Sequence, residues 1–331
     1  MRKVRLGAIQ PHYPSLPPEY NCVRENFSAD PQEIFEKALI PYIELTAGLL
    51  EQAGEAGCGA VTTCEDLCGT AAFLARTGTR EEGNLFPDLL ELTAPYAEER
   101  IAGIARRYQM NIIACYNRRE GGKNYNQAAV FNRKGGIVGR YRKTHLPPNE
   151  MWQVEAGTEF PVFDLDFGRV GVSICYDMMF PEMCQSLSLK GAEVVFHPTA
   201  GYGWYDSIGE ATLRTRANDG DFYLVTAKNY IWNAAGHSSV IDYWGQVLAD
   251  AGFYENAVVF QDVDLDIPKT QPEWFYPSQV SGFAGIHPRK LRERQPHLYG
   301  ELTKPAKPLA VPTPEEQAVL LEKMRDGRCH W

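Results

Sequence analysis

Residues 169–182 have the sequence RVGVSICYDMMFPE, which predicts a strand that ends at a corner and leads into a helix. Bulky and small residues alternate from Val170 to Ile174, as they do in a strand with one bulky and one small face. Pro181 suits the first turn of a helix, because its φ is already fixed and no amide proton is needed there. Cys175 therefore lies at the strand-to-helix corner, where open α/β sheets gather their ligands.

Two further strand ends carry charged groups. Residues 59–64 (GAVTTC) predict a short strand followed by Glu65. Residues 141–146 (YRKTHL) predict a second strand, which contains Lys143 and is stopped by two prolines that cannot donate to a ladder. A carboxylate, an ammonium and a thiol brought together can perform acyl transfer without a metal or an organic cofactor.

These stretches, together with others in the same order, resemble the nitrilase or carbon-nitrogen hydrolase superfamily. The resemblance covers residues 4 to 299, and the joint pattern is far more specific than any single piece. The matching pieces are VRLGAIQ (4–10), Cys64-Glu65 in place of the usual Pro-Glu, NYNQAAVF (124–131), GRYRKTHLP (139–147), Glu150, the cysteine block (171–182), Arg216-Ala217, Asn229, GHSSVID (236–242) and Trp244-Gly245.

The resemblance implies a four-layer αββα sandwich with two mixed sheets face to face. The sequence itself favours an α/β fold, because predicted strands and helices alternate along the chain. Helices are expected near 31–56, 95–109 and 207–219 and after Pro181. Strands are expected near 4–10, 59–64, 111–117, 169–175, 193–197, 221–228, 237–242 and 256–264, with a hairpin near 125–143.

The resemblance also implies a mechanism on an amide substrate. Glu65 is the general base, Cys175 attacks the carbonyl carbon, and Lys143 stabilises the oxyanion with the N–H of Tyr176. Ammonia or an amine leaves, and water then hydrolyses the thioester. Glu150 orients Lys143 or the substrate, although Glu155 lies close enough in sequence to take this place.

The residues expected to contact the substrate are Tyr176, Met179, His197 and Thr199. Tyr176 and the next residue, Asp177, are similar to amidase and ω-amidase members, whereas nitrilases usually have Trp-Glu. Relatives that bind a substrate carboxylate commonly place arginine near Met179. A thioether makes no bidentate ion pair, so a neutral or apolar acyl group is favoured unless Arg169, Arg214 or Arg216 supplies a charge.

Each of these residues also has a structural interpretation. Buried cysteines are commonly inert, and a lone Lys143 or Glu65 would be a solvated charge. His145 and His197 fit hydrogen-bonded structural residues, and Asp177 fits a helix cap. Three other functions stay open: a nitrilase, an N-carbamoyl amidohydrolase and a non-catalytic scaffold member of the family.

Composition limits the partners. The chain has 331 residues, 44% of them hydrophobic, and a net charge of −9 without a basic stripe, which argues against nucleic acid. No apolar run approaches the length of a membrane span or a signal-peptide core, so a cytoplasmic protein is expected. The eight cysteines show no repeated Cys-x-x-Cys spacing, and neither a metal nor a cofactor is expected.

We expect a catalytic domain over residues 1–300 and a tail over 301–331. In the tail, residues 313–316 (TPEE) read as a capping box, and the short helix that follows is expected to dock on its own or a neighbouring subunit. The insertion at 11–30 is a possible pocket rim. The expected partners are a small-molecule amide and further copies of the chain, as a homodimer or a larger homo-oligomer.

Overall fold

The computed structural model describes residues 1–12, 30–77, 85–151, 153–200, 207–229, 236–267 and 293–304. The chain divides into two compact units, Met1–Pro288 and Arg289–Trp331. The predicted rim at 11–30 lies almost entirely outside the described residues, and so does the predicted tail helix. The boundary after residue 300 stays a prediction.

The first sheet has six strands in the order β12-β1-β2-β3-β4-β5. Strands β1, β2 and β3 are parallel to one another, while β12, β4 and β5 pair antiparallel with their neighbours. The sheet is therefore mixed. Its strands are β1 (Lys3–Gln10), β2 (Ala60–Thr62), β3 (Asn111–Glu120), β4 (Lys123–Phe131), β5 (Ile137–Arg142) and β12 (Ala257–Asp264).

The second sheet repeats this plan in the order β11-β10-β9-β8-β7-β6. Its central strands β7, β8 and β9 are parallel, and the other pairs are antiparallel. Its strands are β6 (Val162–Asp164), β7 (Arg169–Val172), β8 (Val194–Thr199), β9 (Tyr223–Lys228), β10 (Ser239–Ile241) and β11 (Val247–Asp250).

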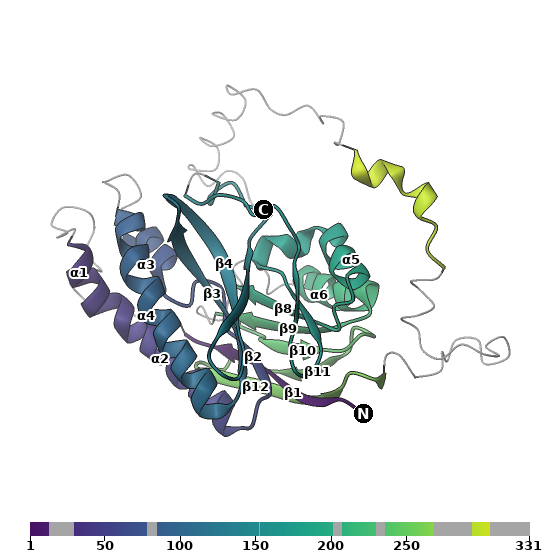
Figure 1. Ribbon diagram of the computed structural model, residues 1–331, viewed down its shortest axis with the longest axis horizontal. Helices are drawn as coiled ribbons and strands as arrows, with labels where there is room; N and C mark the ends of the chain where they lie inside the picture. Colours follow the sequence, from purple (N-terminus) through teal and green to yellow (C-terminus); the bar gives the residue numbers. More distant parts are fainter. Residues whose placement is uncertain are drawn as a thin grey trace. The chain divides into compact units, whose positions relative to one another are not determined.

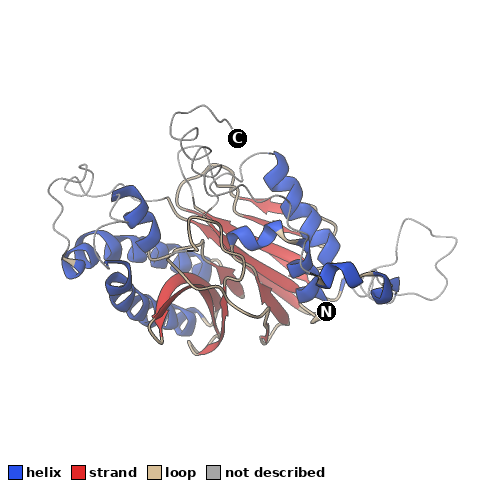
Figure 2. Cartoon of the chain, turned by 90° about the horizontal axis from the view of Figure 1, so that it is seen from above, coloured by secondary structure: helices blue, strands red, loops and turns tan. Residues whose placement is uncertain are grey.

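Helices cover the outer face of each sheet. Helices α2 and α4 contact β1 and β3, α6 contacts β9, and α5 packs against α6. In Figure 1 the first pair lies to the left of the strands and the second pair to the right, and Figure 2 shows the strands between the two sets of helices. The helices are α1 (Pro31–Ile34), continued by a π-helical turn (Phe35–Leu39) into α2 (Ile40–Glu55), then α3 (Thr70–Thr77), α4 (Leu85–Tyr108), α5 (Pro181–Leu189) and α6 (Ser207–Gly220).

The inner faces of the two sheets meet, since β1 contacts β9 and β10, and β2 contacts β8. Apolar side chains such as Leu6, Val130 and Val172 are buried in one cluster that includes strands of both sheets. The architecture is the four-layer αββα sandwich expected from the resemblance. Strand β2 of the first sheet leads to Glu65, and strand β7 of the second sheet leads to Cys175.

Several element boundaries differ from the sequence-based expectation. The strand expected over 141–146 ends at Arg142, so Lys143 follows the strand instead of lying within it. The helix expected from residue 95 begins at Leu85, and Pro95 lies inside it. A proline inside a helix removes one hydrogen bond, but Leu89, Leu90 and other side chains of the first turns are buried, which offsets this cost.

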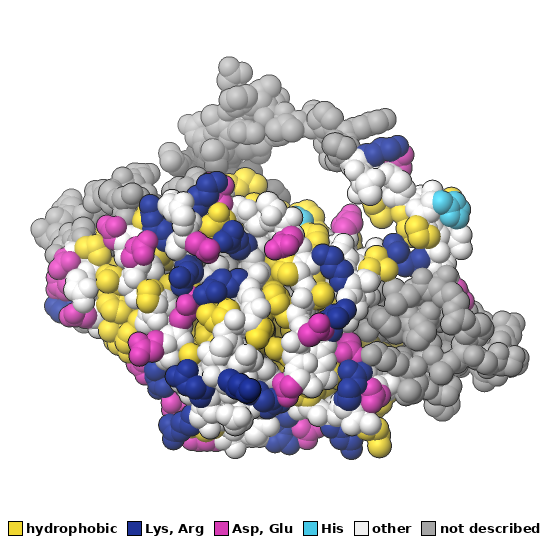
Figure 3. Space-filling view, in the orientation of Figure 1, with side chains coloured by type: hydrophobic (Ala, Val, Ile, Leu, Met, Phe, Trp, Pro, Cys, Tyr) yellow, Lys and Arg dark blue, Asp and Glu magenta, His cyan; other side chains and the backbone are white. Residues whose placement is uncertain are grey.

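The face shown in Figure 3 carries a mixture of charges. Basic and acidic side chains are interspersed over the described residues of this face. Ion pairs at the surface of the molecule include Arg133 with Asp166 at 2.7 Å. No helix in the described part of the chain is both long and apolar enough to span a bilayer. In the second unit the described residues form two short 3₁₀ turns, Pro296–Leu298 and Gly300–Thr303.

Candidate active site

Cys175 lies at a sharp corner of the backbone. Strand β7 ends at Val172, and a 3₁₀ turn over Cys175–Met179 leads to α5, which begins at Pro181. The φ of Cys175 is +46°, in the left-handed region that non-glycine residues seldom adopt. Residues held in this region often belong to functional sites, because the surrounding structure must enforce the conformation. The corner leaves Cys175 partly exposed while Ile174 and Met178 are buried.

Interactions of Asp177 hold this corner against the segment that contains Lys143. The Asp177 carboxylate accepts hydrogen bonds from the Ile174 N–H at 2.9 Å and the Tyr141 hydroxyl at 2.7 Å. It also accepts from the backbone N–H of His145 at 3.0 Å, and the His145 ring stacks on Phe180 with centroids 3.9 Å apart. Asp177 therefore caps the turn, as one of the two sequence interpretations held, and also joins the two segments.

Glu65 follows β2 and is almost completely buried. Its Oε1 accepts hydrogen bonds from Lys143 Nζ at 2.8 Å and from the side-chain amide of Asn126 at 2.8 Å. Its Oε2 accepts from the backbone N–H of Ala200, just past the end of β8, at 3.0 Å. Three segments of the chain thus fix the carboxylate, and the Cys175 thiol also interacts with it.

Lys143 lies between two carboxylates. Its side chain is 0% exposed, and Nζ donates to Glu150 Oε1 at 2.8 Å and Oε2 at 2.9 Å in addition to Glu65. Glu155, the alternative to Glu150, instead pairs with Lys123 at 3.7 Å on the surface. The second carboxylate beside Lys143 therefore comes from Glu150.

The charges in this cluster set its protonation states. Burial alone would lower the pKa of Lys143, but the charges of Glu65 and Glu150 contribute to raising it well above its ordinary value. Burial opposes ionisation of Glu65 as well, yet the adjacent Lys143 ammonium brings the pKa of Glu65 below its ordinary value. The pKa of Glu150 is raised, first by burial and then by the charge of Glu65. An ionised Glu65 beside a charged Lys143 follows.

The thiol of Cys175 is held in its protonated form. Burial, followed by the negative charge of Glu65, raises the pKa of Cys175 to about 12, although Lys143 and a hydrogen bond with Thr199 act in the opposite direction. At neutral pH the free protein therefore holds a thiol beside a carboxylate that can accept its proton. This is the arrangement that general-base activation of a nucleophile requires.

The four residues expected to contact the substrate occupy different surroundings. Thr199 ends β8 and interacts with Cys175, which places it next to the thiol. Tyr176 is partly exposed and packs edge-on against Phe180, with centroids 5.5 Å apart. Met179 is 51% exposed. His197 is buried, its Nδ1 lies 3.0 Å from the Ser173 hydroxyl, and burial followed by the charge of Lys228 lowers its pKa to about 4.

The three arginines considered as carboxylate ligands already have protein partners. Arg169 pairs with Asp164 at 2.7 Å, and Arg214 donates to the Gly245 carbonyl at 2.7 Å. Arg216 donates to the carbonyl of Met178 at 3.2 Å, so its guanidinium lies against the turn that contains Cys175. Of the three, Arg216 is the one joined directly to this turn.

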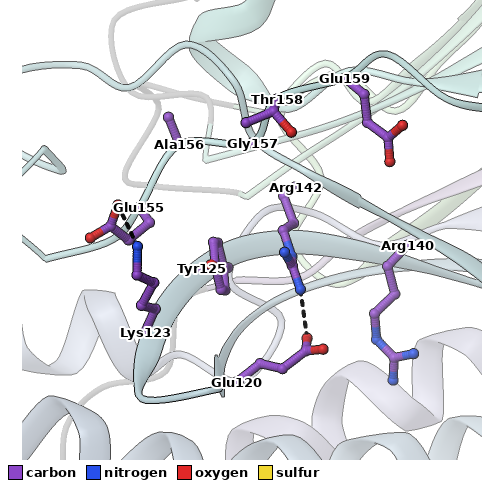
Figure 4. Close-up of a pocket in the computed structure, with 10 residues that line it drawn as sticks. All are labelled: Glu120, Lys123, Tyr125, Arg140, Arg142, Glu155, Ala156, Gly157, Thr158 and Glu159. Carbon is purple, nitrogen blue, oxygen red and sulfur yellow. Dashed lines mark hydrogen bonds and ion pairs between the residues drawn. The ribbon is translucent and has the colours of Figure 1, made fainter.

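A separate hollow of about 590 Å³ lies between the ends of β4 and β5 and residues 155–159. Figure 4 shows that charged side chains face it, and that two of its cations are paired, Lys123 with Glu155 and Arg142 with Glu120. Arg142 also lies over the ring of Tyr125, 4.0 Å from its centroid. Neither Cys175 nor Glu65 lines this hollow.

Two contacts of Glu65 were not expected from the sequence. Ala200 contributes a backbone N–H, which a sequence pattern does not mark. Asn126 lies on β4, and its side chain reaches both carboxylates of the cluster. A signal for Asn126 was available: it shares one face of the predicted strand with Ala128 and Val130, next to the strand that leads to Lys143.

Comparisons with known proteins agree with this fold. The carbon-nitrogen hydrolase family matches residues 83–268. The omega-amidase NIT2 of Homo sapiens is 33% identical over 202 residues, which are 54% of this chain and 71% of the relative. A hydrolase encoded in the pqqF 5′ region of Pseudomonas protegens is 33% identical over 218 residues, covering 62% and 70%.

Solved structures share the fold. A carbon-nitrogen hydrolase from Helicobacter pylori G27 superposes with a TM-score of 0.67 at 22% identity, over 92% of this chain and 99% of that one. An amidase from Nesterenkonia sp. gives a TM-score of 0.64 at 20% identity, over 90% and 96%. The family match, together with the shared sandwich, makes this a protein of the nitrilase superfamily. More particularly, the chain belongs to the carbon-nitrogen hydrolase family.

Proposed function

We propose that this chain is a thiol amidohydrolase, which cleaves a non-peptide amide C–N bond through a thioester on Cys175. The observation that carries the proposal is the buried Lys143 ammonium, held 2.8 Å from both Glu65 and Glu150. The charge of Glu65 in turn raises the pKa of the Cys175 thiol. A base, a nucleophile and a cation in one desolvated site are the three groups that acyl transfer uses.

In the first half-reaction Glu65 takes the thiol proton as sulfur attacks the carbonyl carbon. The new C–S bond gives a tetrahedral intermediate, whose oxyanion is stabilised by Lys143 and the backbone N–H of Tyr176. Glu65 then returns the proton to the nitrogen, the C–N bond breaks, and ammonia or an amine leaves. A thioester remains on Cys175.

The second half-reaction reverses these roles with water. Glu65 removes a proton from water, whose oxygen attacks the thioester carbonyl and forms a second tetrahedral intermediate. The C–S bond breaks, the sulfur regains the proton and the carboxylic acid is released. Glu150 takes no proton in this scheme; it keeps Lys143 charged and in place.

An amide is favoured over a nitrile by two independent features. Tyr176 and Asp177 follow the cysteine, where nitrilases usually have Trp-Glu. The relative from Homo sapiens is named an omega-amidase. A nitrilase would release ammonia and acid from nitriles, which a panel of nitriles and their matching amides tests directly.

Trapping the thioester tests the proposed function. The intact chain is mixed with short aliphatic amides, quenched in acid within milliseconds to seconds and weighed by mass spectrometry. The expected result is a mass increase equal to the acyl group on the peptide that contains Cys175, together with ammonia release. The Cys175→Ala chain takes up no such mass. Ammonia release without any acylated species, and at an equal rate in Cys175→Ala, would exclude the thioester mechanism.

Met179 is proposed to select the acyl group. Replacing Met179 with Arg adds a cation beside the turn, so kcat/KM for an amide with a terminal carboxylate should rise by about tenfold relative to the neutral amide of equal length. Met179→Leu, which keeps an apolar side chain, is the matched control and should leave the ratio unchanged. An unchanged ratio in Met179→Arg would place residue 179 outside the pocket.

A further inference from the structure

Asn126 contacts both carboxylates of the buried cluster and the backbone of Lys143, although it is neither acid nor base. Its side-chain amide donates to Glu65 at 2.8 Å and to Glu150 at 3.5 Å. Its backbone carbonyl accepts a hydrogen bond from the backbone N–H of Lys143 at 2.9 Å. The side chain is buried, and its Oδ1 faces the thiol of Cys115 at 3.6 Å.

The neighbours of Asn126 fix the orientation of its amide. Ionised carboxylates only accept hydrogen bonds, so the NH₂ group must face Glu65 and Glu150. The thiol of Cys115 can donate, and it meets the carbonyl oxygen. A flipped amide would turn an acceptor toward two carboxylates and lose both bonds.

The need for such a donor follows from the charges. Glu65 and Glu150 share one ammonium, so the three groups together carry a negative charge in a desolvated site. Two carboxylates close to each other favour protonation of one of them. A neutral donor that bonds to both reduces this repulsion without adding a second cation, which would compete with Lys143 for the oxyanion.

We propose that Asn126 is a positioning residue that keeps Glu65 ionised and turned toward Cys175. This inference rests on the proposed function. With Oε1 held by Asn126 and Lys143, the other oxygen, Oε2, stays at the Ala200 N–H. Without the amide of Asn126, Glu65 would take up a proton at higher pH and stop acting as a base.

Several ionisable groups surround Asn126 and Glu65, and all of them are present in the wild type and in the Asn126 variants. Lys143, Glu150 and Cys175 act on Glu65 directly. In the described part of the chain the charge of Glu65 also acts on Asp66, Cys115 and His197. Burial raises the pKa of Asp66 to about 7, so the test compares chains that differ at residue 126 alone.

The test replaces Asn126 with Leu, which keeps the size and removes the donor, and with Asp, which keeps the shape and adds a third carboxylate. Gln127→Leu is the matched control. Gln127 is the next residue on β4, so it points to the opposite face of the sheet. It is also buried, and its amide has no hydrogen-bond partner in the described part of the chain. The first measurement is kcat/KM for an amide between pH 4 and pH 9.

The acid limb of the rate profile is expected to move to higher pH by about one unit in Asn126→Leu and further in Asn126→Asp, because a lost hydrogen bond, and still more an added carboxylate, disfavours the ionised form of Glu65. Gln127→Leu keeps the wild-type limb. A residue that only supports the fold would lower the rate by the same factor at every pH. An unmoved limb in both Asn126 variants would overturn the proposal.

A second measurement does not depend on activity. The urea midpoints of the wild type and Asn126→Leu are compared between pH 3 and pH 7. The amide that Asn126→Leu removes donates hydrogen bonds to carboxylates that are ionised at neutral pH. The difference between the midpoints should therefore widen as pH rises and close as the carboxylates become protonated. A difference that stays constant with pH would contradict the inference even if the chain hydrolysed no amide. Absence of hydrolysis by the wild type would contradict the proposed function alone.

Discussion

Glu65→Gln is expected to lower kcat by a factor of about 10² to 10⁴, the range that a positioned general base contributes. The reason is the protonation state of Cys175, whose pKa is raised to about 12, so at neutral pH sulfur attacks only if its proton is removed in the same step. Glutamine retains the size of Glu65 and accepts from Lys143, but it takes no proton. Rates are measured at saturating amide.

Two comparisons separate chemistry from folding in this experiment. In Glu65→Gln the new side-chain NH₂ group would face the N–H of Ala200, which in the wild type donates to the carboxylate at 3.0 Å. A stability loss of about 1–3 kcal/mol is therefore expected and is measured by urea unfolding. Glu155→Gln is the matched control, because Glu155 lies on the surface beside Lys123. Retention of more than a tenth of wild-type kcat in Glu65→Gln would remove Glu65 as the base.

The sequence alone was sufficient for the order of the main elements. Alternating bulky and small residues indicated β7, Pro181 indicated the start of α5, and the family resemblance indicated β1. The two edge strands of the second sheet were not predicted: β11 is mostly exposed and β6 has three residues, so neither shows a core-facing pattern. Both form because a neighbouring strand offers free backbone groups, which is a property of the folded sheet.

The site was predictable in part for a similar reason. Cys175, Glu65 and Lys143 follow strands, and strand ends can be located from local patterns. The distances among them depend on two sheets packing face to face, so no local pattern contains them. The left-handed φ of Cys175 and the contact between Asn126 and Glu65 belong to this second kind. The roles expected of these residues came from the family resemblance, and their neighbours became known only from the fold.

Lys143→Met is expected to lower the free energy of unfolding at pH 7 by about 3–5 kcal/mol, because removing one partner of a buried ion pair leaves the other charges uncompensated. Here two carboxylates, Glu65 and Glu150, would lose their shared cation. Loss of the group facing the oxyanion should also lower kcat by about 10² to 10³. Lys123→Met is the matched control: its exposed pair with Glu155 should contribute about 0–1 kcal/mol.

The pH dependence of this loss distinguishes a charge effect from a packing effect. In the wild type Lys143 brings the pKa of Glu65 below its ordinary value, so its contribution to stability is present at neutral pH and is lost as pH falls through that pKa. In Lys143→Met, burial and mutual repulsion raise the pKa of both carboxylates above that of the unfolded chain. The free-energy cost of burying the two ionised carboxylates is then absent where both are protonated, near pH 4, and grows as pH rises. Urea unfolding of both chains at pH 4 and pH 7 should therefore show the larger difference at pH 7, and an equal difference at the two pH values would mean that Lys143 acts through its volume alone.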